Sequence, residues 1–351
     1  MENLNIEKIK VVTQLKKQKF KKRRKFYKLK KNNLKNDSII YRLYKLPIIF
    51  FMIIVLLFMN YISQNNQIMK LNLFNIKVCL CTVGKEENKY ILEFIEHYKK
   101  IGVDKIYLYD NNNIDGEHFE EVIDNYIKSG FVEIVDFRGQ KSVLNIVAED
   151  CHKKNYMNYD WLIFYEIDEY IHLRNHNIKS YLNQSHFDNC EIIYLNWIFH
   201  TDNNKLYYEN KPLKVRFPEI QKDLHTLKGI KSILKGHIPH IRIKNIHELD
   251  DRLKKCDGYG RPAKNSGIGT YNIDYTNYYI DHYASKSTEE FAKKINKGDI
   301  LHQLNNKFSR IKASFEYNEV TQEKIDYFDK HVPGFSTSSL KEELIQRLKN
   351  K

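Results

Sequence analysis

The fold is decided by residues 77–116, which read KVCLCTVGKEENKYILEFIEHYKKIGVDKIYLYDNNNIDG. Residues 77–83 are mainly apolar and predict a buried strand, and residues 105–109 predict a second strand. Between them, residues 90–101 carry apolar side chains at helical spacing and predict an amphipathic helix. A strand, a helix and a strand in this order indicate a right-handed crossover between parallel neighbours.

The same alternation continues after residue 116. The pattern predicts helices over residues 117–128 and around 143–153, with a strand over 132–137 between them. It then reaches WLIFYEIDEYIHL, residues 161–173, whose apolar start predicts an inner strand. Because strands and helices alternate at spacings of about 10–15 residues, we expect an α/β fold with a mainly parallel, Rossmann-like central sheet flanked by helices.

The alternation loosens after about residue 190. Residues 192–198 and 278–283 predict two more strands, and an irregular stretch rich in His, Lys and Tyr separates them. Ser287 with Glu290 three residues later matches a capping box, which predicts a helix that begins directly after Ser287.

Positive charge is concentrated at the start of the chain. The 351 residues carry a net charge of +14; residues 1–45 hold 16 Lys or Arg and 3 Asp or Glu, whereas the rest hold 42 and 41. A nearly neutral body is not typical of a nucleic-acid-binding domain, so no nucleic acid is expected as a partner. One alternative stays open, in which the basic run over residues 16–31 binds RNA or anionic lipid and is the working part of the protein.

An uncharged apolar run follows this basic segment. It reads LPIIFFMIIVLLFMNYI, residues 46–62, and as a helix it would extend roughly 25 Å, near the thickness of the thinner bilayers of the early secretory pathway. The run starts far from Met1 and no small-x-small cleavage site follows it, so we expect an uncleaved signal anchor. The positive-inside rule then predicts a cytoplasmic tail over 1–45, and a lumenal stem over 63–76.

This topology predicts a single-pass type II membrane protein of the Golgi or ER. The sequon Asn183-Gln184-Ser185 would lie on the lumenal side and accept a glycan. The cysteines would all be lumenal as well, and their odd number leaves at least one unpaired without predicting which pairs form. They are Cys79, Cys81, Cys151, Cys190 and Cys256.

Polar residues follow three of the predicted strands. Ligands of open α/β sheets bind beyond the carboxyl ends of the strands, so these residues are expected to converge at one edge. There is no G-x-G-x-x-G and no G-x-x-x-x-G-K-[ST] in the chain, which argues against a Rossmann dinucleotide site and a P-loop. The polar residues are Thr82, Lys85 and Glu86, then those from Asp110 to Asp115, then Glu166, Asp168 and Glu169.

The pair Glu166-x-Asp168 after a buried strand has two interpretations. Two carboxylates at a strand end are often no more than a solvated loop. They are also hard oxygen ligands for Mg²⁺ or Mn²⁺, and such an ion binds a diphosphate through the phosphate oxygens. The pair alone does not decide between the two.

Three ordered motifs give the pair a context. They are the segment at 77–116, the segment YDWLIFYEIDEYI at 159–171 and the segment HYASKSTEEFAKKINKGD at 282–299, with Gln140, Asn145 and Cys151 between the first two. Together they resemble glycosyltransferase family 92, including its D-x-D-E-F motif and its H-Y-x-x-K-S-x-E-E-F-x-x-K-x-x-[RK]-G-D ending. The resemblance covers roughly residues 77–300 and implies a GT-A fold. We therefore expect a glycosyltransferase domain over 77–330 and a C-terminal tail over 331–351.

The resemblance also implies roles for individual residues. Asp168 would bind a divalent metal, Mn²⁺ or Mg²⁺, between the phosphates of a nucleotide sugar, and His282 would be a further metal ligand. Glu166 stands where the family usually has Asp, so its contact with ribose or metal is a departure from the family pattern. The remaining donor-binding positions would be Thr82, Lys85 and Glu86 around the nucleotide, Asp110 on a uracil-like base, and Lys286 on a phosphate.

The implied reaction moves a hexose, galactose-like and from a UDP-sugar, to a glycan or glycoprotein acceptor with inversion. A carboxylate should deprotonate the acceptor hydroxyl. Glu248, in the segment IHELD, is favoured for this role over Glu219, Asp250 and Asp251. Two alternatives remain open: a catalytically weakened relative that binds nucleotide sugars or glycans, which Glu166 motivates, and a nucleotidyltransferase, which the anchor and the third motif disfavour.

Overall fold

The computed structural model describes residues 51–63, 76–141, 143–224, 229–263, 265–266, 269–270, 274–297 and 307–350. The chain divides into two compact units, Met1–Leu71 and Asn72–Lys351. In the first unit, residues 51–63 form a helix whose apolar side chains are exposed. The predicted tail and most of the predicted stem lie outside the described residues, and so do residues 46–50 of the predicted membrane span. Over the part of the chain that is described, no helix has both the length and the apolar character needed to cross a bilayer.

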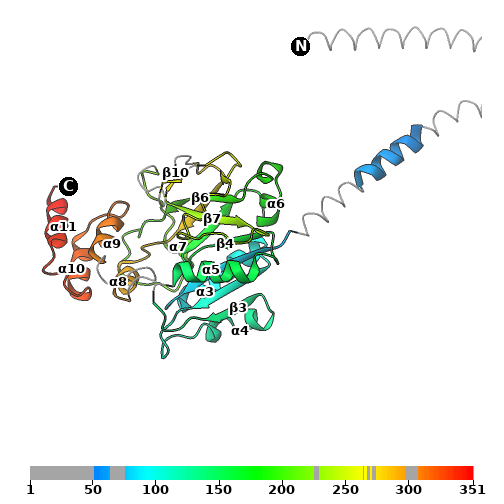
Figure 1. Cartoon of the computed structure of the whole chain (residues 1–351). Coiled ribbons are helices and arrows are strands. Elements are labelled where there is room, and N and C mark those ends of the chain that lie inside the picture. Colours follow the sequence, from blue (N-terminus) through cyan, green and yellow to red (C-terminus); the bar gives the residue numbers. More distant parts are fainter. Residues whose placement is uncertain are drawn as a thin grey trace, which may run out of the picture. The chain divides into compact units, whose positions relative to one another are not determined.

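The second unit is built on one sheet, with helices packed on it (Figure 1). The order of the strands in this sheet is β3-β2-β1-β4-β7-β6-β11-β5, and β8 pairs with β6. The strands are β1 Val78–Gly84, β2 Lys105–Asp110, β3 Val132–Asp136, β4 Trp161–Phe164, β5 Glu169–Leu173, β6 Ile192–Phe199, β7 Ile230–Lys235, β8 Lys255–Asp257 and β11 Tyr278–His282, with β9 Asn265–Ser266 and β10 Gly269–Thr270 in a separate ribbon. The helices are α3 Asn88–Ile101, α4 Glu120–Lys128, α5 Leu144–Asn155, α6 Ile178–Leu182, α7 Leu213–Arg216, α8 Thr288–Asn296, α9 Lys307–Ser314, α10 Gln322–His331 and α11 Ser339–Lys349, with a 3₁₀ turn at Ser185–Phe187.

The sheet is mixed, not mainly parallel as the sequence predicted. Strands β3, β2, β1 and β4 are parallel, which confirms the α/β alternation of the first half. Strand β7 is antiparallel to both β4 and β6, and β5 is antiparallel to β11. A parallel neighbour of β4 needs a crossover of about a dozen residues or more, and β5 begins only five residues after β4 ends, so β5 cannot be that neighbour. It lies at the far edge of the sheet, beside β11.

Strand β1 is buried on both faces because each face has its own helix. Val78 and Leu80 belong to the core that α3 closes, whereas Cys79, Cys81 and Val83 belong to the core that α5 closes. This two-sided burial explains why the strand reads as an unbroken apolar run.

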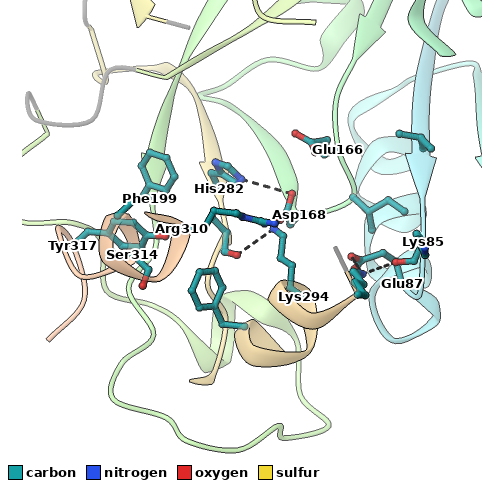
Figure 2. Close-up of a pocket in the computed structure, with 16 residues that line it drawn as sticks. Lys85, Glu87, Glu166, Asp168, Phe199, His282, Lys294, Arg310, Ser314 and Tyr317 are labelled. Carbon is teal, nitrogen blue, oxygen red and sulfur yellow. Dashed lines mark hydrogen bonds and ion pairs between the residues drawn. The ribbon is translucent and has the colours of Figure 1, made fainter. Parts of the chain in front are cut away.

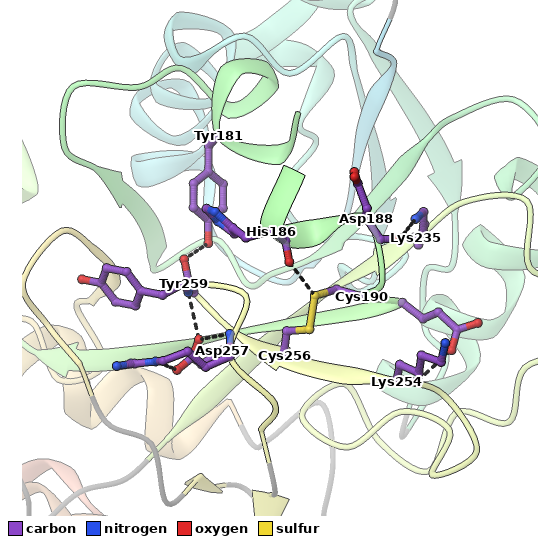
Figure 3. The surroundings of a disulfide bond; sticks show 12 residues. Tyr181, His186, Asp188, Cys190, Lys235, Lys254, Cys256, Asp257 and Tyr259 are labelled. Atoms are coloured by element: carbon purple, nitrogen blue, oxygen red, sulfur yellow. Dashed lines mark hydrogen bonds and ion pairs between the residues drawn. A yellow bond between two sulfur atoms is a disulfide. The ribbon is translucent and has the colours of Figure 1, made fainter. Parts of the chain in front are cut away.

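Two disulfides link distant parts of this unit. Cys81 of β1 is bonded to Cys151 of α5, and Cys190 is bonded to Cys256 of β8 (Figure 3). The sequence separations are 70 and 66 residues. Cross-links that close loops of this length stabilise a fold by roughly 4 kcal/mol each through their effect on the unfolded chain. Cys79 is buried and is not in a disulfide.

The C-terminal helices have a core of their own. Apolar residues of α8, α9, α10 and α11 form a third cluster, in which Leu340 and Leu344 of α11 are buried. Figure 1 shows α9, α10 and α11 gathered at the C-terminal end of the unit. The segment over 331–351, which the sequence analysis assigned to a tail, thus contains a packed helix.

A buried ion pair joins α8 to the rest of the unit. The helix begins at the predicted capping box of Ser287 and Glu290, which the structure confirms. The Glu290 carboxylate accepts hydrogen bonds from both terminal nitrogens of Arg216, at 2.7 and 3.0 Å, and from Tyr90 Oη at 2.5 Å. Tyr90 belongs to α3 and Arg216 to α7, so one carboxylate ties three helices together.

We expect Glu290→Gln to lower the free energy of unfolding by roughly 3–5 kcal/mol, because it leaves the Arg216 guanidinium buried without a counter-charge. Burial would raise the pKa of Glu290, but hydrogen bonds from Arg216, Ser287 and Tyr90 lower it to about 2. Its stabilisation is therefore complete above the unfolded-state pKa of about 4.3 and disappears as the pH falls towards about 2. Urea unfolding at pH 7 and pH 3 measures both effects.

The matched control is Glu343→Gln, which removes a surface partner of Lys312 and should cost less than about 1 kcal/mol. Equal losses in the two variants, or a Glu290→Gln effect that does not shrink at pH 3, would contradict this account of the α8 junction.

Candidate functional site

A cavity of about 300 Å³ opens at the carboxyl ends of β1 and β4. Its walls come from the segments that follow these two strands, from the end of β11, and from helices α8 and α9 (Figure 2). Its charged and aromatic lining residues are Lys85, Glu87, Glu166, Asp168, Phe199, His282, Phe291, Lys294, Lys297, Arg310 and Tyr317.

Asp168 is a buried acid of the cavity whose charge is balanced by two nearby lysines. It is buried, and its Oδ2 accepts a hydrogen bond from Lys294 Nζ at 2.6 Å, with Lys286 Nζ 4.0 Å away. Burial would raise the pKa of Asp168, but the charges of Lys294 and Lys286 and the hydrogen bond from Lys294 bring it well below its usual range. The group is therefore ionised at any physiological pH.

Glu166 is held by a lysine that the sequence analysis did not single out. Its Oε2 accepts a hydrogen bond from Nζ of Lys231 at 2.7 Å, and the same ammonium lies 3.3 Å from Glu169 Oε2. Lys231 lies in β7 and is completely buried. The available signal was Lys231, which lies between apolar residues inside the run IKSILK, since a buried lysine requires an acidic partner. Burial and the nearby charge of Glu166 raise the pKa of Glu169 to about 8, although Lys231 opposes them.

His282 closes the cavity from the end of β11. Its ring packs against Trp197 and Phe199, with centroids 4.5 and 4.9 Å away. Gly229 makes room for this packing, because a Cβ there would lie 1.7 Å from the Trp197 ring. Burial lowers the pKa of His282 to about 3 despite the charge of Asp168, so the imidazole is neutral. Its Nδ1 is buried and has no hydrogen-bond partner among the described residues.

The residues present fit a divalent ion that shares its ligands with a substrate. His282 Nε2 lies 3.7 Å from Asp168 Oδ1, which is too long for a hydrogen bond. Two ligand atoms that are each about 2.1 Å from one ion are separated by roughly 3–4 Å, so this spacing suits a common ion. Within the described ranges, no group of three or more His, Cys, Asp or Glu side chains could hold a metal. An ion at this place would take its other ligands from substrate phosphates and water, as Mg²⁺ commonly does.

Four of the predicted donor-binding residues, Thr82, Glu86, Asp110 and Lys286, do not line this cavity. Thr82 is buried in β1, and its hydroxyl has no partner in the described part of the chain. Asp110 is paired with Arg138, whose Nε and Nη2 each lie 2.7 Å from Asp110 Oδ2. Glu86 is exposed, with φ at 55°, and its backbone N donates to Asn112 Oδ1. Lys85 does line the cavity. The nucleotide-binding roles of these residues stay predictions.

The four carboxylates considered as the base occupy different environments. Glu219 lines a second cavity of about 420 Å³, which shares Tyr317 with the first. Glu248 does not line either cavity, and its Oε1 lies 3.8 Å from Lys244 Nζ. Asp250 is paired with Arg252, and Asp251 is paired with Lys244 and Lys255.

Three lysines of the third motif lie close to these acids; Lys294 and Lys297 line the cavity, whereas Lys286 does not. Lys286 is buried, with its Nζ 3.9 Å from Glu87 Oε2 and 4.2 Å from the centre of the Tyr90 ring. Lys297 Nζ donates to Lys85 O at 2.5 Å and to Glu87 Oε1 at 3.0 Å. Lys294 contacts Asp168, and the sequence analysis gave this lysine no role.

Known proteins resemble this chain in sequence and, weakly, in structure. The model of glycosyltransferase family 92 matches residues 75–329. A family 92 protein of Oryza sativa subsp. japonica is 29% identical over 113 residues, which cover 29% of this chain and 19% of that relative. The chain thus matches about a fifth of that relative's length.

Among solved structures, TarS of S. aureus gives a TM-score of 0.31 at 11% identity, covering 77% of this chain and 50% of TarS. A shorter form, TarS 1–349 in complex with UDP-GlcNAc, gives 0.34 at 10% identity, covering 74% and 80%. We draw no conclusion from TM-scores of 0.31 and 0.34. The family match spans most of the chain and confirms the resemblance of the three motifs: this chain belongs to glycosyltransferase family 92.

Proposed function

We propose that the protein transfers a hexose, galactose-like, from a UDP-sugar to a hydroxyl group of a glycan or glycoprotein. One observation carries the proposal: in a chain of family 92, Asp168, His282 and several cationic side chains converge on one cavity at the carboxyl ends of β1 and β4. This edge is where nucleotides bind to open α/β sheets.

The charge of the cavity suits a diphosphate. Lys85, Lys294, Lys297 and Arg310 all line it, and lysine and arginine side chains are the common phosphate-binding groups of proteins. Ser314 and Tyr317 supply hydroxyl groups on the same wall, which suit a sugar.

The proposed reaction is an inverting displacement. The acceptor oxygen forms a bond to the anomeric carbon as the bond from that carbon to the diphosphate oxygen breaks, and the acceptor proton passes to a carboxylate base. Asp168 and His282 would hold a Mn²⁺ or Mg²⁺ ion, and such an ion supplies Lewis-acid neutralisation of the departing diphosphate. Glu166 stays beside Lys231, which orients its carboxylate at the cavity wall.

The position of the second cavity favours Glu219 as the base. It adjoins the first cavity at Tyr317, and its walls are rich in carboxylate and amide groups, which accept hydrogen bonds from sugar hydroxyls. An acceptor glycan in this cavity would lie next to the donor cavity at Tyr317. Glu248, the residue favoured from the sequence, has no such position.

A second candidate function is binding of a nucleotide sugar without turnover. The observation that favours it is the Glu166–Lys231 pair, because a carboxylate neutralised by a buried lysine is a poorer ligand for ribose or metal.

We also propose that the enzyme is a type II membrane protein with its catalytic domain in the lumen of the Golgi or ER. The two disulfides support this proposal, because disulfides persist in oxidising compartments. The exposed Asn183 of the sequon supports it too.

The direct test of the activity is release of nucleotide from UDP- and GDP-sugars, with and without Mn²⁺. We expect one UDP-sugar to be consumed, and Asp168→Asn to lower kcat/KM by about a hundredfold or more, because a bound metal supplies several kcal/mol of transition-state stabilisation. The control Asp124→Asn changes only a surface pair with Lys128 and should match the wild type. A folded protein that binds UDP-sugars but releases no nucleotide would favour the binding function instead.

The two base assignments predict different variant kinetics. Glu219→Gln should lower kcat by roughly 10²–10⁴-fold with little change in donor KM, as expected for loss of a general base. Glu248→Gln should have less than about a threefold effect. If Glu248→Gln has the larger effect on kcat, the sequence-based choice is correct and the choice made from the cavities is wrong.

Topology predicts a glycan at Asn183. Protein made in a eukaryotic secretory host should lose apparent mass on treatment with an N-glycosidase, and Asn183→Gln should remove that loss. Asn36→Gln is the control, since Asn36-Asp37-Ser38 would be cytoplasmic. A shift that depends on Asn36 and not on Asn183 would reverse the proposed orientation.

A further inference from the structure

Lys294 forms an ion pair with Asp168, the carboxylate that would bind the metal in the proposed function. It lies near the end of α8, and its Nζ donates to Asp168 Oδ2 at 2.6 Å and to Ala284 O at 3.2 Å (Figure 2). The ammonium and a divalent ion on the same carboxylate would repel each other. Binding of a divalent ion to Asp168 should therefore weaken the ion pair between Asp168 and Lys294, and the ion pair should weaken metal binding.

The other lysines near these acids are held more firmly. Lys231 is completely buried between Glu166 and Glu169. Lys286 is 4% exposed and lies over the Tyr90 ring. Their stems and ammonium groups are confined by packing, so neither has an obvious route into the cavity.

Lys297 and Lys294 differ in exposure and in their acidic partner. Each ammonium donates to one carboxylate and one backbone carbonyl, and both line the cavity. The Lys297 side chain is 13% exposed and pairs with Glu87, whereas the Lys294 side chain is 24% exposed and pairs with Asp168. Its four-carbon stem is flexible, which allows the ammonium to move without movement of the helix.

The donor would change the balance of charge around Lys294. A bound diphosphate would bring negative charge close to the Lys294 ammonium, and the accompanying divalent ion would be coordinated by Asp168. Both changes favour transfer of Lys294 from the carboxylate to a phosphate oxygen.

We propose that Lys294 is an exchangeable counter-ion, paired with Asp168 in the empty site and with the donor diphosphate in the loaded site. The proposal rests on the proposed function, because it takes the ligand to be a UDP-sugar. In the empty enzyme Lys294 neutralises Asp168 and competes with metal. In the loaded enzyme it positions the diphosphate.

Two binding measurements on the full-length protein test both halves. Mn²⁺ affinity without nucleotide is measured by electron paramagnetic resonance, and UDP affinity in EDTA is measured by calorimetry. For Lys294→Met we expect Mn²⁺ to bind about tenfold more tightly, because a competing cation is gone, and UDP to bind about tenfold more weakly, because a charge-assisted hydrogen bond is lost. A purely structural role would weaken both.

Matched variants separate charge from packing. Lys293→Met removes a neighbouring lysine that is paired with Glu289 and should leave both affinities unchanged. Lys294→Arg keeps the charge and should keep UDP affinity within about threefold. Lys294→Gln gives the same test as Lys294→Met if the methionine variant does not fold.

The proposal is overturned if either affinity of the uncharged Lys294 variants equals that of the wild type or moves in the opposite direction. Failure of the proposed function has a different signature: the wild type itself binds no UDP, with or without Mn²⁺. A wild type that binds UDP as tightly as Lys294→Met contradicts the counter-ion role alone.

Discussion

Charge compensation at the end of β4 is the constraint on which the rest of the site depends. Three acidic residues, the half-buried Glu166 and the buried Asp168 and Glu169, follow one buried strand within four residues, and a buried carboxylate is costly unless a cation neutralises it or it stays protonated. The cations come from distant segments: Lys231 from β7, and Lys286 and Lys294 from the region of α8. Insertion of β7 beside β4 and docking of α8 across the edge are therefore conditions for this acidic motif to exist at all.

The dependence of the site on residues from distant segments explains which features the sequence could predict. The strands and helices of the first half follow from local periodicity, and the capping box at Ser287 follows from two residues three apart. Strand ends and motif resemblance both point to Asp168, whereas only the resemblance points to His282. Lys231 could not be paired with Glu166, because the partners are 65 residues apart and antiparallel pairing of β7 has no local signal.

The same limit applies to other parts of the chain. Residues 331–351 contain α11, which buries only Leu340 and Leu344, so its packing has little local signal in the sequence. Arg138 was not connected with Asp110 for the same reason that Lys231 was missed. In each case the missing information is a long-range partner, whereas the chemistry of the single residue was readable.

The central claim is that one cavity holds a metal ion and a donor diphosphate between Asp168, His282 and the lysines of the third motif. A crystal structure of the protein with UDP and Mn²⁺, with anomalous diffraction at the manganese edge, tests it most directly. The account predicts a manganese peak within coordination distance of Asp168 and His282, with the diphosphate against Lys294. A peak at other residues, or UDP bound outside this cavity, would contradict it.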